Sequence, residues 1–93
     1  MSIVVRYTPA NLTRDKYDEV VRRLEQAGQW PNPKGMELHI LFGSEENLLV
    51  SEIWDSQDSL DAVGETVFPI LTEVGVTFSA EPEIFEVHNI VKR

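Results

Sequence analysis

The chain has 93 residues, of which 42% are hydrophobic and 26% are charged, and it contains no cysteine. This length has room for one hydrophobic core, so residues 1–93 are expected to form a single globular domain. The lack of cysteine excludes disulfides, thiolate metal sites and a cysteine nucleophile, and it suits a reducing cytoplasm. The net charge of −8 disfavours nucleic acid and anionic membranes as partners.

No apolar run approaches the roughly 20 residues that a membrane-spanning helix needs. The first residues also lack the basic stretch that opens a signal peptide. A cytoplasmic location is therefore expected.

The first half of the chain begins with a strand and a helix. Residues 2–8 are rich in β-branched side chains and are followed by Pro9, which cannot donate to a ladder. The next segment predicts a helix, with Thr13 as its N-cap and Gly28 at its C-terminal end. The apolar residues of this helix recur at three- and four-residue steps and form one stripe: Tyr17, Val20, Val21, Leu24 and Ala27.

A loop with two prolines, beginning at Trp30, separates this helix from a predicted strand over residues 36–42. The next predicted strand, over 48–54, follows a five-residue polar link that contains glycine, which indicates a hairpin. Alternation along the strand over 36–42 places an apolar set on one face and His39 on the other. That apolar set is Met36, Leu38, Ile40 and Phe42.

The remaining residues predict a helix and a last strand. Ser56 is the expected N-cap of the helix and Gly75 its C-terminal end. Pro69 lies inside the helical pattern and is expected to kink or split the helix near residues 66–68, because proline lacks an N–H group and clashes with the preceding turn. The last strand is predicted over residues 83–91.

The predicted order of elements is β-α-β-β-α-β. Right-handed crossovers place both helices on one face of a single antiparallel sheet. The sequence therefore predicts an α+β protein with the ferredoxin-like fold. In that fold the strands over 36–42 and 83–91 are the two edges of a four-stranded sheet, about 14 Å apart at the usual strand spacing.

The helix-free face of this sheet is predicted to carry apolar side chains as well. Both faces of the strand over 83–91 contain apolar residues, as do both faces of the strands over 2–8 and 48–54. A sheet whose second face is in water alternates cleanly between apolar and polar residues. We therefore expect a homodimer in which two such faces pack together around a shared interior. The alternative is a monomer in which the C-terminal tail or the Trp30 loop covers that face.

His39 and His88 are the only histidines, and histidine exchanges protons near neutral pH without a large pKa shift. If they face a pocket with Arg6 or Glu86 nearby, they are candidate catalytic residues that orient a phenol or enol and move its proton. The alternative is that each is hydrogen bonded at a sheet edge or in the dimer interface. Two histidines without local ligand spacing do not predict a metal site.

Arg6 lies on a predicted central strand, where a charge is rarely buried without a partner. It is therefore also a candidate catalytic residue, as an anchor for an anion or a carbonyl group in the cavity. The alternative is an ion pair with Glu52 or Glu86 across the sheet.

Tyr7, Trp54 and Trp30 are candidates for the wall of an aromatic pocket. The alternative for Trp54 is core packing against the second helix. Trp30 is expected either to fold over the mouth of a pocket or to cap the first helix.

Three stretches, at residues 35–39, 50–60 and 68–71, resemble small bacterial members of the dimeric α+β barrel superfamily, near the antibiotic-biosynthesis-monooxygenase-like proteins. The stretch VSEIWDSQDSL is the most characteristic, because it resembles the exit of that family's third strand into its second helix. The resemblance implies an intersubunit barrel with a pocket in each subunit. Related proteins include cofactor-independent oxygenases of aromatic polyketides and haem-degrading enzymes.

The same resemblance bears on the cofactor and the pocket. Haem-degrading relatives use a histidine of the second helix as an axial ligand, and this chain has no histidine between Ser56 and Gly75. Haem is therefore not expected, and no cofactor is predicted. Oxygenase relatives have asparagine, tryptophan and tyrosine in the pocket. Tyr7, Trp54 and Asn89 are of these types, which makes them pocket candidates without a catalytic assignment.

We therefore predict a homodimer that binds a small aromatic or apolar metabolite and, on the enzyme hypothesis, converts it as a cofactor-independent monooxygenase does. The alternative is a non-catalytic ligand-binding or assembly module. The enzyme hypothesis calls for a pocket of roughly a few hundred Å³ with at least two convergent polar groups. A module would have either a filled interior or an open apolar surface.

Overall fold

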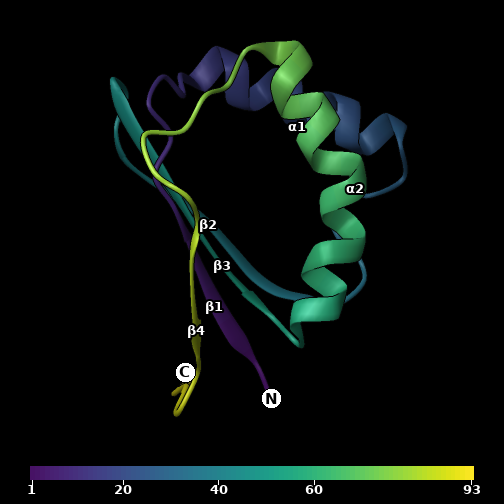
Figure 1. The fold of residues 1–93 in the computed structure, drawn as a ribbon, viewed down its shortest axis with the longest axis vertical. Coiled ribbons are helices and arrows are strands. Elements are labelled where there is room, and N and C mark those ends of the chain that lie inside the picture. Colours follow the sequence, from purple (N-terminus) through teal and green to yellow (C-terminus); the bar gives the residue numbers. More distant parts are fainter.

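The computed structural model describes residues 1–93 and contains the six predicted elements in the predicted order. They are β1 (Ile3–Tyr7), α1 (Arg14–Gln26), β2 (Met36–Ser44), β3 (Asn47–Trp54), α2 (Gln57–Val74) and β4 (Glu83–Glu86). The strands form one antiparallel sheet in the order β2-β3-β1-β4, and both helices lie on one side of it (Figure 1). The predicted ferredoxin-like βαββαβ fold is confirmed.

Local sequence signals set the ends of the helices. The hydroxyl of Thr13 accepts a hydrogen bond from the backbone N–H of Lys16, and the hydroxyl of Ser56 accepts one from that of Ser59. Each cap satisfies one N–H group that the first helical turn leaves free. Gly75 ends α2 with a φ of 91°, a left-handed conformation that glycine adopts at little cost.

α2 is continuous through Pro69, so of the kink or split predicted near residues 66–68 the split does not occur. Its axis instead curves over the sheet (Figure 1). Pro69 removes one backbone hydrogen bond, but the helix packs against the sheet through Leu60 and Val63 on one side of the proline, and Leu71 packs into the core on the other. Neither α1 nor α2 has the length and apolar character needed to cross a membrane.

The strand register decides which side chains face the helices. A shift between Met36 and Leu38 adds one residue to β2 relative to β3. Met36 therefore pairs with Trp54 and His39 with Glu52, all on the inner, helix-facing side. The prediction that Met36 shares a face with Leu38 is wrong, because strict alternation does not allow for the bulge.

Two buried clusters connect the layers. The first joins β1 and β3 to α2: Ile3, Val5, Trp54, Leu60 and Val63. The second joins α1 to β3 and to the segments that precede α1 and follow α2: Leu12, Val20, Leu24, Leu48 and Val76. Members of both clusters line the pocket described below.

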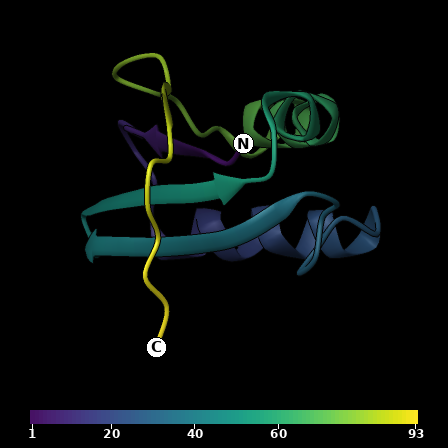
Figure 2. The same ribbon diagram turned by 90° about the horizontal axis from the view of Figure 1, so that it is seen from below.

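The outer face of the sheet is uncovered. Leu38, Ile40 and Phe42 of β2 and Phe85 of β4 are 41% to 49% exposed. Figure 2 shows the C-terminal segment after β4 running across the direction of the strands, but it leaves these side chains exposed. Trp30 lies in the pocket wall instead, so neither segment covers this face as the monomer alternative requires.

β4 is shorter than predicted, because its partner strand ends. β4 pairs with β1 in antiparallel register, with Glu86 opposite Ile3, and the N–H of Val87 donates to the carbonyl of Ser2. Beyond that point only Met1 remains to pair with. Residues 88–93 therefore form no ladder and are exposed.

Candidate functional site

Glu52 is a buried carboxylate on the inner face of the sheet. Its Oε2 atom lies 2.7 Å from Nδ1 of His39, and its Oε1 atom accepts a hydrogen bond from the indole N–H of Trp54 at 3.0 Å. The sheet positions both partners: His39 is directly opposite on β2, and Trp54 is two residues further along β3 on the same face. The side chains of His39 and Glu52 are only 14% and 12% exposed.

This pairing fixes the tautomer of the neutral histidine ring. An ionised carboxylate can only accept hydrogen bonds, so Nδ1 of His39 carries a proton that it donates to Glu52. In the neutral ring Nε2 is then the basic nitrogen with a free lone pair. A histidine held by a carboxylate in this way is oriented as a proton acceptor, and the carboxylate stabilises the imidazolium that forms when it takes a proton.

Two aromatic side chains enclose the basic nitrogen. The hydroxyl of Tyr17, from α1, lies 2.8 Å from Nε2 of His39, and the two rings are stacked with centroids 5.9 Å apart. Trp30, from the loop before β2, meets the imidazole edge-on at 4.8 Å between centroids. His39 is thus held by a carboxylate on one side and by aromatic groups on the other.

The nearby tyrosines remain protonated. Burial is the main cause that raises the pKa of Tyr7 far above its ordinary value, and the negative charge and hydrogen bonding of Glu52 raise it further. Burial and the charge of Glu52 also raise the pKa of Tyr17. Both phenols therefore act as hydrogen-bond donors at neutral pH, and neither is a ready proton acceptor.

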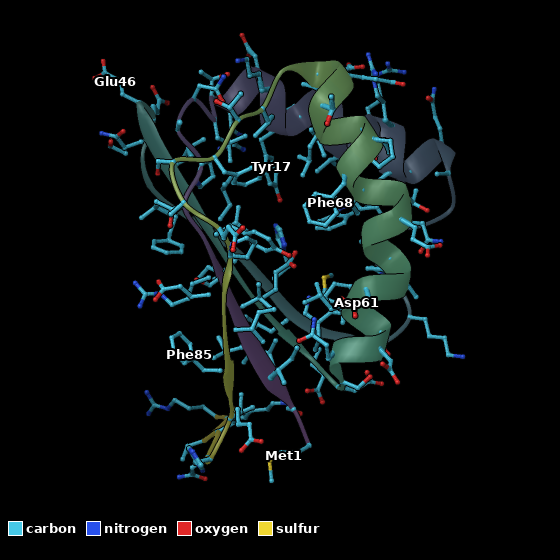
Figure 3. All side chains as sticks on the ribbon, viewed as in Figure 1. Met1, Tyr17, Glu46, Asp61, Phe68 and Phe85 are labelled. Atoms are coloured by element: carbon cyan, nitrogen blue, oxygen red, sulfur yellow. The ribbon has the colours of Figure 1, made fainter.

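These groups line a pocket between the sheet and the two helices. Its volume is about 100 Å³, and its accessible wall is almost entirely apolar. Figure 3 shows Phe68 directed from α2 toward the space between helices and sheet, and this ring is 47% exposed, which places it at the pocket mouth. The volume is below the few hundred Å³ expected of an enzyme pocket, while the convergent polar groups are present. An apolar cavity of about 150 Å³ accommodates benzene, so an aromatic ring enters this smaller pocket only if a side chain at its mouth, such as Phe68, moves.

Four of the candidate residues line this pocket: Tyr7, Trp30, His39 and Trp54. The structure does not bring the other three to it. Arg6 points to the outer face and is exposed, so it makes no ion pair with the inward-facing Glu52. His88 and Asn89 are exposed and lie beyond the end of β4.

Two members of the site, Glu52 and Tyr17, were not predicted from the sequence. The sequence offers Glu52 as an ion-pair partner for Arg6, but a carboxylate two residues before Trp54 on a central strand must share the face of that tryptophan. Tyr17 was assigned to the apolar stripe of the first helix. Its contact with His39 spans 22 residues and depends on how α1 lies on the sheet.

The pocket residues do not fit haem. α2 carries no histidine, and a volume of about 100 Å³ is far too small for a porphyrin. No three histidine, cysteine, aspartate or glutamate side chains gather closely enough to hold a metal ion.

No family model and no curated protein matches the chain, but solved structures do. SnoaB, a cofactor-independent oxygenase from Streptomyces nogalater, superposes with a TM-score of 0.60 at 17% identity, over 99% of this chain and 96% of that one. A provisionally assigned antibiotic biosynthesis monooxygenase from Deinococcus radiodurans gives 0.61 at 13% identity, over 100% and 98%. A heme-degrading protein from Mycobacterium tuberculosis gives 0.55 at 21% identity, over 99% and 100%.

At these identities the likeness is one of fold, and fold alone does not assign an activity. It extends over essentially the whole chain. The chain therefore has the fold of the antibiotic-biosynthesis-monooxygenase-like proteins, as the resemblance of its sequence predicts.

Proposed function

We propose that the protein binds a small aromatic or apolar metabolite in the pocket between sheet and helices, and that His39 accepts a proton from a hydroxyl group of that ligand. The observation that carries this proposal is the bond between His39 and Glu52, which directs a basic nitrogen into an otherwise apolar pocket. In such surroundings a single well-placed polar group determines how a ligand is oriented.

The reaction that fits this arrangement is oxygenation without a cofactor, the activity that the description of SnoaB gives for that protein. Transfer of a phenol proton to Nε2 of His39 leaves an electron-rich phenolate, and Glu52 stabilises the imidazolium. Dioxygen is the co-reactant. A ring CH₂ group becomes C=O and gains one oxygen atom, while the second oxygen atom leaves as water with the two hydrogens, which balances atoms and electrons.

The outer face of the sheet supports the proposal of a homodimer. Leu38, Ile40, Phe42 and Phe85 form a group of half-exposed apolar side chains that no other part of the chain covers. Burial of such a face against a second copy removes it from water and satisfies two-fold symmetry. The same face favours the second candidate function, a non-catalytic module that binds a ligand or assembles through its sheet.

Binding of 4-nitrophenol and of nitrobenzene, measured by calorimetric titration, tests the proposed function. The two probes differ by one hydroxyl group, so the ratio of their affinities reports the proton acceptor. We expect the wild type to prefer 4-nitrophenol and His39→Phe to lose that preference. His88→Phe, at an exposed position, is the matched control and should retain it.

A preference for 4-nitrophenol that survives in His39→Phe would rule out His39 as the acceptor. Oxygen uptake then separates the two functions. With a one-ring phenol that has a ring CH₂ group beside its aromatic ring, such as indan-5-ol, an enzyme consumes dioxygen in proportion to protein concentration. A non-catalytic module binds the probe without uptake above the buffer rate.

A further inference from the structure

The basic nitrogen of His39 has no vacancy for a ligand. Every buried side-chain nitrogen and oxygen has a hydrogen-bond partner within the chain. The two oxygens of Glu52 are engaged by His39 and Trp54, and Nε2 of His39 is engaged by Tyr17. A ligand hydroxyl that binds the basic nitrogen must therefore replace a group of the protein.

The hydrogen bonds that His39 and Trp54 donate to Glu52 are not the ones that a ligand replaces. His39 and Glu52 face each other on paired strands, and Trp54 is 2% exposed within the core. Release of either donor would leave a buried carboxylate with fewer partners, which is costly.

The hydrogen bond between Tyr17 and His39 neither joins paired strands nor lies fully in the core. Tyr17 projects from α1, near its N-terminal end, and its side chain is only partly buried. Rotation about its two side-chain torsions carries the hydroxyl to water, which replaces the lost hydrogen bond at little cost. Among the polar contacts of the pocket, this one is the easiest to open.

We infer that the hydroxyl of Tyr17 occupies the position on His39 that a ligand hydroxyl takes, and that a phenol or enol with one aromatic ring binds by replacing the Tyr17 hydroxyl on Nε2. This inference rests on the proposed function and adds to it the class of ligand and a contact that limits affinity. Tyr17 is a positioning residue in this account, because it occupies Nε2 of His39 and leaves that nitrogen when the ligand hydroxyl arrives.

The surroundings favour the same class of ligand. Tyr17 presents a neutral hydroxyl and a flat ring, stacked on His39 with Trp30 at the imidazole edge, and a phenolic ligand repeats each of these contacts. The carboxylate of Glu52 and the net charge of −8 disfavour a ligand that arrives as an anion. A ligand with a neutral hydroxyl that ionises only after it reaches His39 repeats the contacts of Tyr17 and avoids repulsion by this negative charge.

Titration of wild type and Tyr17→Phe with 4-nitrophenol and nitrobenzene tests this inference. Phenylalanine keeps the ring but frees Nε2, so we expect the affinity for 4-nitrophenol to rise about fivefold, the value of one neutral hydrogen bond. The affinity for nitrobenzene, which has no hydroxyl to place on Nε2, should not change. A weaker or unchanged affinity for 4-nitrophenol in Tyr17→Phe would overturn the inference.

The ring signals of Tyr17 in the wild type, assigned by NMR, give a second readout that does not depend on a variant. They should shift to solvent-exposed values with 4-nitrophenol bound, and persistence of the ring on His39 in that complex would also overturn the inference. The two proposals fail differently. If His39→Phe keeps the preference for 4-nitrophenol, the proposed function fails. If only the Tyr17 results are contrary, His39 remains the acceptor and Tyr17 is a fixed part of the wall.

Discussion

His39 and Glu52 face each other across the β2–β3 ladder, with Nδ1 of the imidazole 2.7 Å from Oε2 of the carboxylate. The sheet brings the two side chains together, because the two residues are direct partners in its register. The pair is therefore available before any ligand binds, and this preorganisation is what a proton acceptor in an apolar pocket needs.

Exchange of the carboxylate for an amide should switch the histidine tautomer. In Glu52→Gln the amide oxygen can accept from Trp54 while its NH₂ group donates to Nδ1 of His39, so the ring proton moves to Nε2. We expect ¹⁵N NMR of the His39 ring to show protonated Nδ1 in the wild type and protonated Nε2 in this variant. An identical tautomer in both proteins would mean that Glu52 does not orient the ring.

Loss of all polar atoms at this position should destabilise the fold. Glu52→Leu leaves the N–H groups of Trp54 and His39 without their acceptor, at an expected loss of about 1–3 kcal/mol in the free energy of unfolding. Glu46→Gln, in the exposed hairpin turn, is the control and should stay within about 0.5 kcal/mol of the wild type. Urea denaturation measures both, and equal stability of the two variants would contradict the account.

Tyr7 should make the protein less stable at high pH. In the unfolded chain its phenol ionises near its ordinary pKa of 10.0, whereas burial and Glu52 raise the pKa in the folded state. The stabilising contribution is complete below about pH 10. Above that pH the unfolded state binds one proton fewer, so stability falls by about 1.4 kcal/mol per pH unit.

Tyr7→Phe removes the contribution of Tyr7 to that slope, while the contribution of Tyr17, whose pKa is also raised, remains. Urea denaturation at pH 10, 10.5 and 11 should therefore show a shallower decline in the variant than in the wild type. Parallel declines would contradict the pKa shift assigned to Tyr7.

A charge on the outer sheet face should dissociate the proposed dimer. Ile40→Glu introduces a carboxylate between Leu38 and Phe42 on the apolar face of β2, where a partner copy would have to bury it. Sedimentation velocity at several concentrations should give a monomer for this variant and a dimer for the wild type. Ile40→Leu, which keeps the face apolar, should remain dimeric, and a wild-type monomer at all concentrations would remove the basis for the dimer.

Substitution of two glycines with positive φ distinguishes the cost of backbone strain from the added cost of close packing. Gly28→Ala, with φ of 76° and no atom within 4 Å of the new Cβ, should cost about 1 kcal/mol. Gly35→Ala, with φ of 93°, would also bring Cβ to 2.5 Å from the side chain of Ser59 at the start of α2, and should cost roughly 2–4 kcal/mol. Equal costs in thermal or urea unfolding would show that Gly35 is not tightly packed.

Local signals in the sequence were sufficient for most of the fold. The caps Thr13 and Ser56 and the stop at Gly75 act within one helical turn, and all three are confirmed. The bulge after Met36 depends on the register with β3, which no local alternation reveals. Likewise, Ile90 continues a strand-like pattern after the partner strand has run out, because the pattern records side-chain type and not the presence of a neighbour.

The site was predicted less completely, for a related reason. His39, Trp30 and Trp54 stood out by residue type alone, but the chemistry depends on which residues meet them. Glu52 meets His39 through strand pairing, and Tyr17 meets it through the placement of a helix on the sheet. Both contacts are products of tertiary structure.

The ionisation state of a bound phenol tests the central claim most directly. The anion of 4-nitrophenol is yellow and the neutral form is not, so absorption spectra of the probe at saturating protein report whether His39 has taken its proton. Below the pKa of the free probe, we predict a larger anion band with the wild type than with Glu52→Gln or His39→Phe. A bound probe that stays neutral in the wild type, or ionises equally in all three proteins, would contradict the account.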